Sequence, residues 1–224
     1  MKRKFTFKIN EFYHIYNRGV DKREIFTDET DCLRFLDGLV FFNQINNIGS
    51  LLENSYRDKN IQSMPIVRIH AYNLLPNHFH LVLEQLEDNG ISIFMHRLCT
   101  GYSKYFNDKY NRSGSLFQGR FKAQHIDREN YMDYVLAYVH QNHNVHQLGS
   151  RASKWKPKSS IKELEFGNAR NGHQICSDRF IYNHCSSIKD YSNYSLSLLG
   201  ECIKQRNAYK DSKYKQGLAY FLNE

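Results

Sequence analysis

LPNHFHLVLE is the sequence of residues 75–84, and its alternating side chains predict a β-strand that starts after a tight Pro-Asn turn. Successive side chains on a strand point to opposite faces, so Phe79 and Leu81 face one side while His78 and His80 face the other. Two imidazoles on one face are a half-site for a divalent metal ion. The alternative is a polar strand face whose histidines only make hydrogen bonds.

Strand and helix patterns alternate on either side of this segment. One helix is predicted after a cap at Thr30-Asp31, and a second opens at Asn89-Gly90. A kink is expected at Gly119, and a polar loop over residues 48–64 follows the first helix. Strands are predicted, in chain order, over residues 12–17, 66–74, 79–84 and 116–126. The order β-α-β-β-α-β is the split βαβ or ferredoxin-like arrangement, so the predicted fold class is α+β with an antiparallel sheet.

A further helix is predicted after the last strand, from a cap at Asp127 to about Asn142. Residues four apart share a helix face, so Tyr134, Tyr138 and Asn142 form one stripe. Placed opposite the two histidines, Asn142 could offer its amide oxygen as a third metal ligand, and Tyr138 its phenol as a nucleophile. The alternative is a stripe of tyrosines packed on the sheet with their hydroxyls hydrogen-bonded.

The composition indicates a polyanionic partner. Lys and Arg number 31 against 23 Asp and Glu, which gives a formal net charge of +8, and 14% of the residues are aromatic. Cations neutralise phosphates and rings stack on bases, so this mixture favours single-stranded nucleic acid over a membrane. No apolar run approaches the roughly 20 residues that a spanning helix needs. The alternative is an ordinary basic protein with an aromatic core.

The first residues and the cysteines bear on location and on other kinds of metal site. The chain starts with a basic segment, residues 1–4, but no apolar core follows over residues 5–16, so a cytoplasmic protein is expected. The five cysteines are scattered without a Cys-x-x-Cys pair. This spacing argues against a disulfide scaffold and against a four-cysteine zinc module.

A change in composition at residues 149–160 predicts the domain organisation. Four cations crowd around Trp155 there without apolar periodicity, as in a basic linker. We therefore predict a first domain over residues 1–150, and a basic linker with a C-terminal helical extension over residues 151–224. Helices are expected over residues 188–199 and 209–222 of that extension, to which no chemistry is assigned.

Four segments together resemble one known family. They are HIYNRG at residues 14–19, LPNHFHL at 75–81, LFQGRFK at 116–122 and YVHQN at 138–142. In order and spacing they resemble the single-tyrosine HUH transposases, and among them most closely the REP-associated tyrosine transposases. The resemblance covers about residues 5–150, and the family's fold is ferredoxin-like. It implies that the HUH pair is His78 and His80, that Asn142 is the third metal ligand, and that Tyr138 is the nucleophile.

The resemblance also implies a reaction. Mg²⁺ or Mn²⁺ is the expected cofactor, and the expected activity is cleavage and rejoining of single-stranded or hairpin-bearing DNA through a 5′-phosphotyrosine. It leaves monomer and homodimer both open. Two other functions remain: a non-catalytic module that binds single-stranded nucleic acid, and a metal-dependent phosphodiesterase that activates water.

Candidate contacts to the DNA phosphates are cations near the predicted site. They are Arg18, Lys104, Arg120 and Lys122, with His14 beside the site on the first strand. The alternative for each of these residues is an exposed cation or a core ring.

Overall fold

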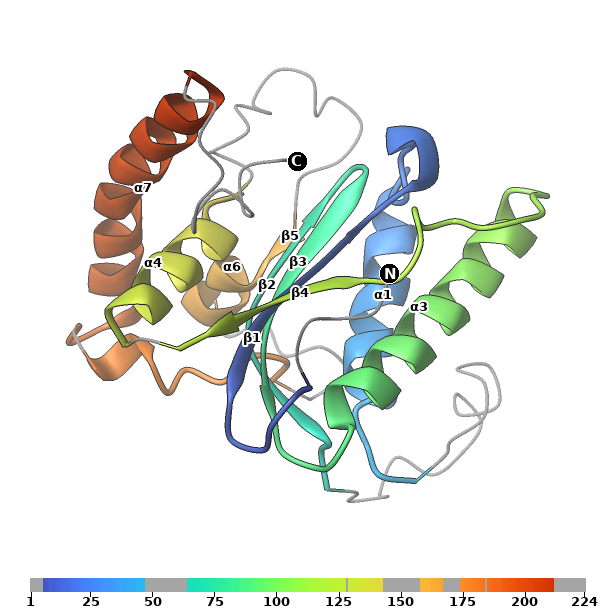
Figure 1. Ribbon diagram of the computed structural model, residues 1–224, viewed down its shortest axis with the longest axis horizontal. Coiled ribbons are helices and arrows are strands. Elements are labelled where there is room, and N and C mark those ends of the chain that lie inside the picture. Colours follow the sequence, from blue (N-terminus) through green and yellow to red (C-terminus); the bar gives the residue numbers. More distant parts are fainter. Residues whose placement is uncertain are drawn as a thin grey trace.

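The fold is built around a five-stranded antiparallel sheet (Figure 1). The computed structural model of the 224-residue chain describes residues 6–46, 64–127, 129–142, 158–166, 174–183 and 185–211. The strands lie side by side in the order β4-β1-β3-β2-β5. Their bounds are Phe12–Arg18 for β1, Val67–Leu75 for β2, His78–Gln85 for β3, Lys122–Ile126 for β4 and Lys158–Ser159 for β5.

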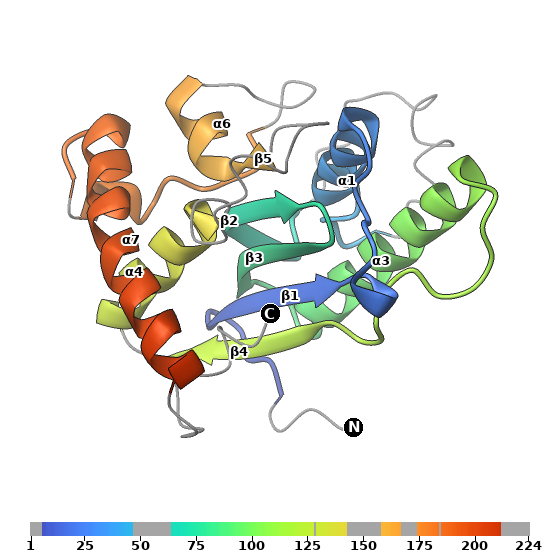
Figure 2. The same ribbon diagram turned by 90° about the horizontal axis from the view of Figure 1, so that it is seen from above.

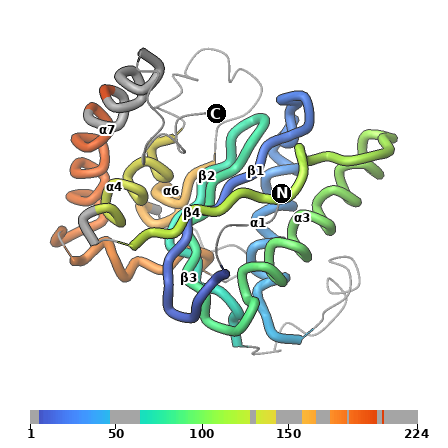
Figure 3. The backbone as a smooth tube through the Cα atoms, in the orientation of Figure 1, coloured from blue at the N-terminus to red at the C-terminus, as the bar shows by residue number. Residues whose placement is uncertain are grey.

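Helices cover both faces of this sheet. Helices α1 (Glu29–Phe41) and α3 (Gly90–Lys109) lie on one face, whereas α4 (Glu129–His140) lies on the other, with α7 (Ile188–Asp211) outside it (Figure 2). Figure 3 follows the backbone from β3 through α3 and β4 into α4. The smaller elements are α6 (Ser160–Phe166) and the short 3-10 helices Val20–Lys22 and Ile181–Asn183.

The order of the elements confirms the predicted α+β, ferredoxin-like fold class. The chain runs β1-α1-β2-β3-α3-β4, and four of its strands lie in the order β4-β1-β3-β2, which is the split βαβ topology. Strand β5 is an addition at the outer edge of β2 that the sequence did not predict. It pairs only two residues, which is too short for an alternating pattern to be recognised.

The central strand β3 divides its side chains between the two faces as predicted. Phe79, Leu81 and Leu83 belong to the large core that α1 and α3 cover. Val82, on the opposite face, belongs to a smaller core beneath α4. His78 and His80 share the face of Val82, so the predicted histidine pair on one face is confirmed.

Helix α1 starts at a different cap from the predicted one. Asp28, not Thr30-Asp31, is the N-cap, and its carboxylate accepts a hydrogen bond from the backbone N–H of Asp31 at 2.9 Å. The buried Asp31 carboxylate instead accepts hydrogen bonds from Thr27 and Lys109, which ties α1 to the end of α3. Because either Asp can cap a helix, the local sequence does not distinguish the two positions.

The last strand of the domain is shorter than predicted. Regular pairing begins only at Lys122, although Phe117 makes an isolated bridge to Gly19. Gly119, where a kink was expected, has φ +122°, a conformation that favours glycine and interrupts the extended backbone. The segment 116–121 is therefore a loop that leads into β4.

Other predicted segments fall partly outside the described residues. The loop at 48–64 and the linker at 149–160 are described only at Met64 and from Lys158 onward. The helix predicted over 188–199 is confirmed and extends to Asp211 as α7. The helix predicted over 209–222 is described only to Asp211, where it continues α7, and the domain boundary at residue 150 stays a prediction. Among the described residues, no helix is both long and apolar enough to cross a membrane.

A cluster around the buried carboxylate of Glu84 joins β2 and β3 at the far end of the α4 face. Glu84 accepts hydrogen bonds from Arg68 at 2.6 Å and from His70 at 3.0 Å, and its side chain is 5% exposed. The hydrogen bond from His70, together with Arg68, lowers the pKa of Glu84 to about 2. Because the folded pKa lies below the ordinary value of 4.5, this carboxylate stabilises the fold above about pH 4.5 and stops doing so as the pH falls toward 2.

We therefore expect Glu84→Gln to lower the free energy of unfolding at pH 7 by up to about 3 kcal/mol. The difference from the wild type should shrink steadily between pH 5 and pH 2, where the wild-type carboxylate becomes protonated. Urea unfolding of both proteins at several pH values measures it. A difference that stays constant over this range would show that the Glu84 charge does not stabilise the fold.

Candidate active site

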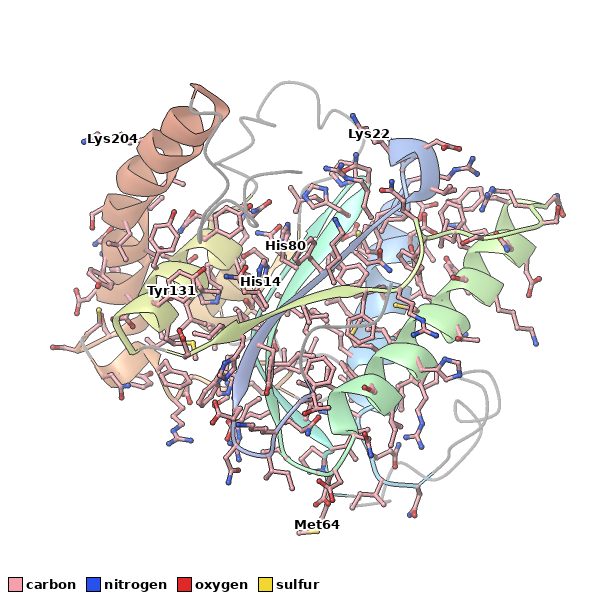
Figure 4. The ribbon with its side chains drawn as sticks, viewed as in Figure 1. His14, Lys22, Met64, His80, Tyr131 and Lys204 are labelled. Carbon is pink, nitrogen blue, oxygen red and sulfur yellow. The ribbon has the colours of Figure 1, made fainter. Side chains whose placement is uncertain are left out.

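Two buried imidazoles form the centre of the α4 face. His14 lies on β1 and His80 on the neighbouring β3, and each has 0% exposure. His14 Nε2 and His80 Nδ1 are hydrogen-bonded at 2.8 Å. Figure 4 shows the two residues next to each other between the sheet and α4. His14 was predicted as a DNA contact, and its burial here favours a role beside His80 instead.

His78 lies at the start of β3, two residues before His80 on the same face. The ring centroids of His78 and His80 are 5.1 Å apart. The Nδ1 atom of His78 is hydrogen-bonded to Asn77 Oδ1 at 2.6 Å. Asn77 in turn donates from Nδ2 to the backbone carbonyl of Lys22, so the turn before β3 holds the ring of His78 in place.

Tyr138 comes to the histidines from α4. Its ring is 2% exposed and packs edge-to-face on His80, with the centroids 5.7 Å apart, and on His14 at 6.2 Å. The last strand β4 leads directly into α4, and the apolar residues of α4, among them Val135 and Val139, pack on the sheet. The predicted nucleophile and one member of the predicted metal pair are therefore in contact.

Asn142 follows Tyr138 by one helical turn and is the predicted third metal ligand. It is completely buried. Within the described ranges, neither amide atom of its side chain has a hydrogen-bond partner. A buried amide without a partner costs free energy unless another group binds it, so this side chain suits a ligand that the protein itself does not supply.

The donor set has the chemistry of an open metal site. Over the described residues, no group of three His, Cys, Asp or Glu side chains is placed to hold a metal ion. The predicted set consists instead of two imidazoles and one amide, His78, His80 and Asn142. Imidazole nitrogens and amide oxygens are ligands for ions such as Mn²⁺, and three protein ligands leave positions for phosphate oxygens and water. The residues present thus fit a divalent ion.

The end of α4 is tied to the sheet by an asparagine that the sequence did not single out. Asn73 lies opposite His80 in the β2–β3 register. Its Nδ2 donates to the carbonyls of Val139, at 2.9 Å, and His140, at 3.3 Å. Ser159 of β5 also donates to the His140 carbonyl, at 2.8 Å. These contacts fix the position of the end of α4, and therefore of Tyr138, relative to the sheet that carries the histidines.

The outer side of α4 is held by α7. His140 Nδ1 is hydrogen-bonded to the hydroxyl of Tyr191 at 3.0 Å, and Gln141 Nε2 donates to Ser195 Oγ at 2.9 Å. All four residues are buried. Burial lowers the pKa of His140 to about 3, so its ring is neutral at physiological pH. The C-terminal extension therefore packs directly behind the helix that carries Tyr138.

The predicted DNA-binding cations separate into two groups. Arg18 lies opposite His78 at the end of β1, and its Nε is buried without a hydrogen-bond partner in the described part of the chain. Lys122 is exposed and lies over the ring of Tyr16 at 5.7 Å from the centroid, and Arg120 is exposed in the loop before β4. Lys104, in contrast, lies on α3 across the sheet, where the structure does not bring it to the site.

Comparison with known proteins gives one family match. Residues 51–142 match the family model described as "Transposase IS200 like". This match confirms the resemblance to single-tyrosine transposases and includes β2, β3, α3, β4 and α4. No curated protein sequence matches.

Several solved structures are similar at low sequence identity. A REP-associated tyrosine transposase bound to a REP hairpin has 17% identity and a TM-score of 0.48, with 79% of this chain and 90% of that chain covered. A transposase-like protein from Deinococcus radiodurans has 16% identity and a TM-score of 0.36, covering 62% of this chain and 95% of that one. A tRNA(His) guanylyltransferase from Saccharomyces cerevisiae has 10% identity and a TM-score of 0.37, with 91% and 82% covered. At these scores the likenesses carry no functional information.

The contacts at the end of α4 predict a graded loss of stability. Asn73→Ala removes the donor to two buried carbonyls, so we expect the free energy of unfolding to fall by about 1–3 kcal/mol. Ser159→Ala leaves the His140 carbonyl its bond from Asn73, and should cost no more than about 0.5–1.5 kcal/mol. Urea unfolding of the two variants compares these values. A larger loss in Ser159→Ala than in Asn73→Ala would contradict the assignment of Asn73 as the main tie.

Proposed function

Because residues 51–142 carry the sequence signature of the IS200-like transposases, we propose that this protein is a metal-dependent endonuclease for single-stranded DNA that cleaves and rejoins strands through Tyr138. The observation that supports this most is the contact of the Tyr138 ring with His80, 5.7 Å between centroids, on the face that also presents His78. The proposed nucleophile and the proposed metal-binding pair are thus adjacent in a buried site. Geometry of this kind is what covalent catalysis by a tyrosine requires.

The proposed reaction is a transesterification. The Tyr138 oxygen attacks the scissile phosphorus, the phenolic proton passes to solvent, and the bond to the 3′ oxygen breaks as that oxygen takes up a proton from solvent. The products are a 5′-phosphotyrosine and a strand with a free 3′-hydroxyl. When bound, a divalent ion supplies charge neutralisation and polarisation of the phosphate. The reverse attack by a 3′-hydroxyl rejoins DNA without a nucleotide cofactor, because the phosphodiester is exchanged and not hydrolysed.

The protein groups have separate tasks in this reaction. His78, His80 and the amide oxygen of Asn142 would hold Mg²⁺ or Mn²⁺, and the amide of Asn142 is a buried polar group that lacks a protein partner over the described residues. Tyr138 is held over the imidazoles by α4. An ordinary tyrosine has a pKa of about 10, so the charges around the bound phosphate must favour loss of its proton.

The DNA strand is proposed to lie across the end of the sheet where β1 finishes. Arg18, Arg120 and Lys122 are on or beside this end, and the exposed Lys122 lies above the buried ring of Tyr16. Cations at this end suit the backbone phosphates of a single strand. The sequence resemblance to REP-associated tyrosine transposases supports hairpin-bearing single strands as the first substrates to try.

A covalent protein–DNA adduct tests the function directly. Wild-type protein incubated with a 3′-labelled hairpin oligonucleotide and Mn²⁺ should give a labelled band on a denaturing protein gel, and chelator should abolish it. Tyr138→Phe should lose the band completely. Tyr134→Phe, one turn earlier on the same helix, is the matched control and should keep it.

Two other outcomes would overturn the proposal in different directions. Released DNA fragments without any adduct would indicate a phosphodiesterase that activates water. Binding without cleavage in a range of hairpins, unaffected by metal and by Tyr138→Phe, would indicate a non-catalytic binding module.

The placement of the cations predicts which of them contact the DNA. Lys122→Ala and Arg120→Ala should each weaken binding of single-stranded DNA several-fold, and should each lower the slope of log affinity against log salt concentration by about 0.7. Lys104→Ala, across the sheet, should change neither. Fluorescence anisotropy titrations at several salt concentrations measure this. An equal effect of Lys104→Ala would place the DNA elsewhere.

A further inference from the structure

The hydrogen bond between His14 and His80 has an unusual geometry for two neighbouring rings. The ring planes differ by only 6°, and the centroids are 5.0 Å apart. The two hydrogen-bonded nitrogens are 2.8 Å apart. The centroid separation is close to the largest value possible at that distance, which is reached when both centroids and both nitrogens lie on one line. The rings therefore lie edge to edge in nearly one plane, and the shared proton lies on the line between the nitrogens, as in a well-aligned hydrogen bond.

Only one of the two nitrogens can carry that proton when both rings are neutral. If His80 donates from Nδ1, its Nε2 keeps a lone pair and can bind a metal ion. If His14 donates from Nε2, the proton of neutral His80 must be on Nε2, and this atom cannot coordinate. The direction of one hydrogen bond thus decides whether His80 is a ligand.

His78 shows the direction that a metal site needs. Its Nδ1 is bonded to Asn77 Oδ1 at 2.6 Å, and Asn77 uses its Nδ2 to donate to the Lys22 carbonyl. The second bond fixes which end of the amide is the oxygen. An amide oxygen only accepts, so His78 donates from Nδ1 and has its lone pair on Nε2. Both histidines of the pair are therefore engaged through Nδ1 by a neighbouring side chain.

We infer that His14 is a positioning residue that accepts a hydrogen bond from His80 Nδ1 and so holds His80 in the tautomer that coordinates through Nε2. This inference rests on the metal site of the proposed function. His14 then orients His80 as Asn77 orients His78, and this role takes the place of the DNA contact predicted for His14.

The surroundings of His14 support a fixed orientation. Its ring lies 5.2 Å from that of Tyr16, at an interplanar angle of 25°, and 6.2 Å from that of Tyr138, which is nearly perpendicular. His14 is completely buried in the middle of β1, between β3 and β4. A ring packed in this way cannot turn away from His80 without breaking the core on this face.

Binding of Mn²⁺ alone to the full-length protein tests the inference without DNA or turnover. His14→Phe fills the space but cannot accept a hydrogen bond, and should weaken Mn²⁺ binding about 10–100-fold, as loss of a group that orients a metal ligand does. His14→Gln can accept through its side-chain oxygen and should stay within a few-fold of the wild type. Electron paramagnetic resonance of free Mn²⁺ gives the affinities, and thermal unfolding without metal shows whether each variant is folded.

The outcomes separate this inference from the proposed function. Wild-type affinity in His14→Phe, with affinity lost in His80→Ala, would overturn the role of His14 alone. Equal losses in folded His14→Phe and His14→Gln would overturn the acceptor role. Unchanged affinity in His80→Ala would overturn the metal site and this inference with it.

A second measurement needs no substitution at His14. Long-range ¹H–¹⁵N spectra of the metal-free wild type distinguish the two imidazole tautomers, and His80→Gln identifies the signals of His80. We expect the proton of His80 on Nδ1. A proton on Nε2 would overturn the inference even if the His14 variants do not fold.

Discussion

Strand β3 is buried along its whole length, and the alternation of its side chains separates the core from the chemistry. Phe79, Leu81 and Leu83 fill the core under α1 and α3, so they fix which way the strand faces. Because side chains alternate along the strand, His78 and His80 must lie on the α4 face. A shift of the register by one residue would place the imidazoles in the apolar core under α1 and α3 and move Phe79, Leu81 and Leu83 onto the α4 face, which is far too costly to compete. The candidate active site is thus oriented by the same contacts that stabilise the domain.

The proposed reaction also requires that Tyr138 keeps a fixed position relative to the histidines. The end of α4 is held from below by Asn73 and from outside by α7, through the buried pairs of His140 with Tyr191 and of Gln141 with Ser195. Residues 188–211 thereby belong structurally to the site although they contribute no side chain to the proposed reaction. Buried polar pairs of this kind are costly to leave half-satisfied, so they favour one docking position over others.

The fold, the histidine pair on one strand face and the stripe on the last helix could be predicted because their signals are local, whereas the proposed roles of these residues came from the family resemblance. The period of two around His78 and His80 and the four-residue spacing from Tyr138 to Asn142 are both short-range patterns. The hydrogen bond between His14 and His80 joins residues 66 positions apart in the sequence, and no local pattern predicts it. The role of Asn73 depends on its contacts with the end of α4, which the sequence of β2 does not indicate. Lys104 could not be distinguished from the other cations before α3 was known to lie across the sheet. Choosing between the two Asp residues that could cap α1 likewise required the contacts of Asp31 with α3.

In the proposed reaction, the Tyr138 oxygen becomes bonded to the 5′ phosphate of a cleaved strand. Mass spectrometry of the protease-digested adduct, formed with Mn²⁺ and a single-stranded hairpin oligonucleotide, tests it most directly. We expect the nucleotide mass on the peptide that contains Tyr138, and fragmentation should place it on that residue with a 5′ linkage. Attachment to another residue, or a 3′ linkage, would rule out the proposed reaction.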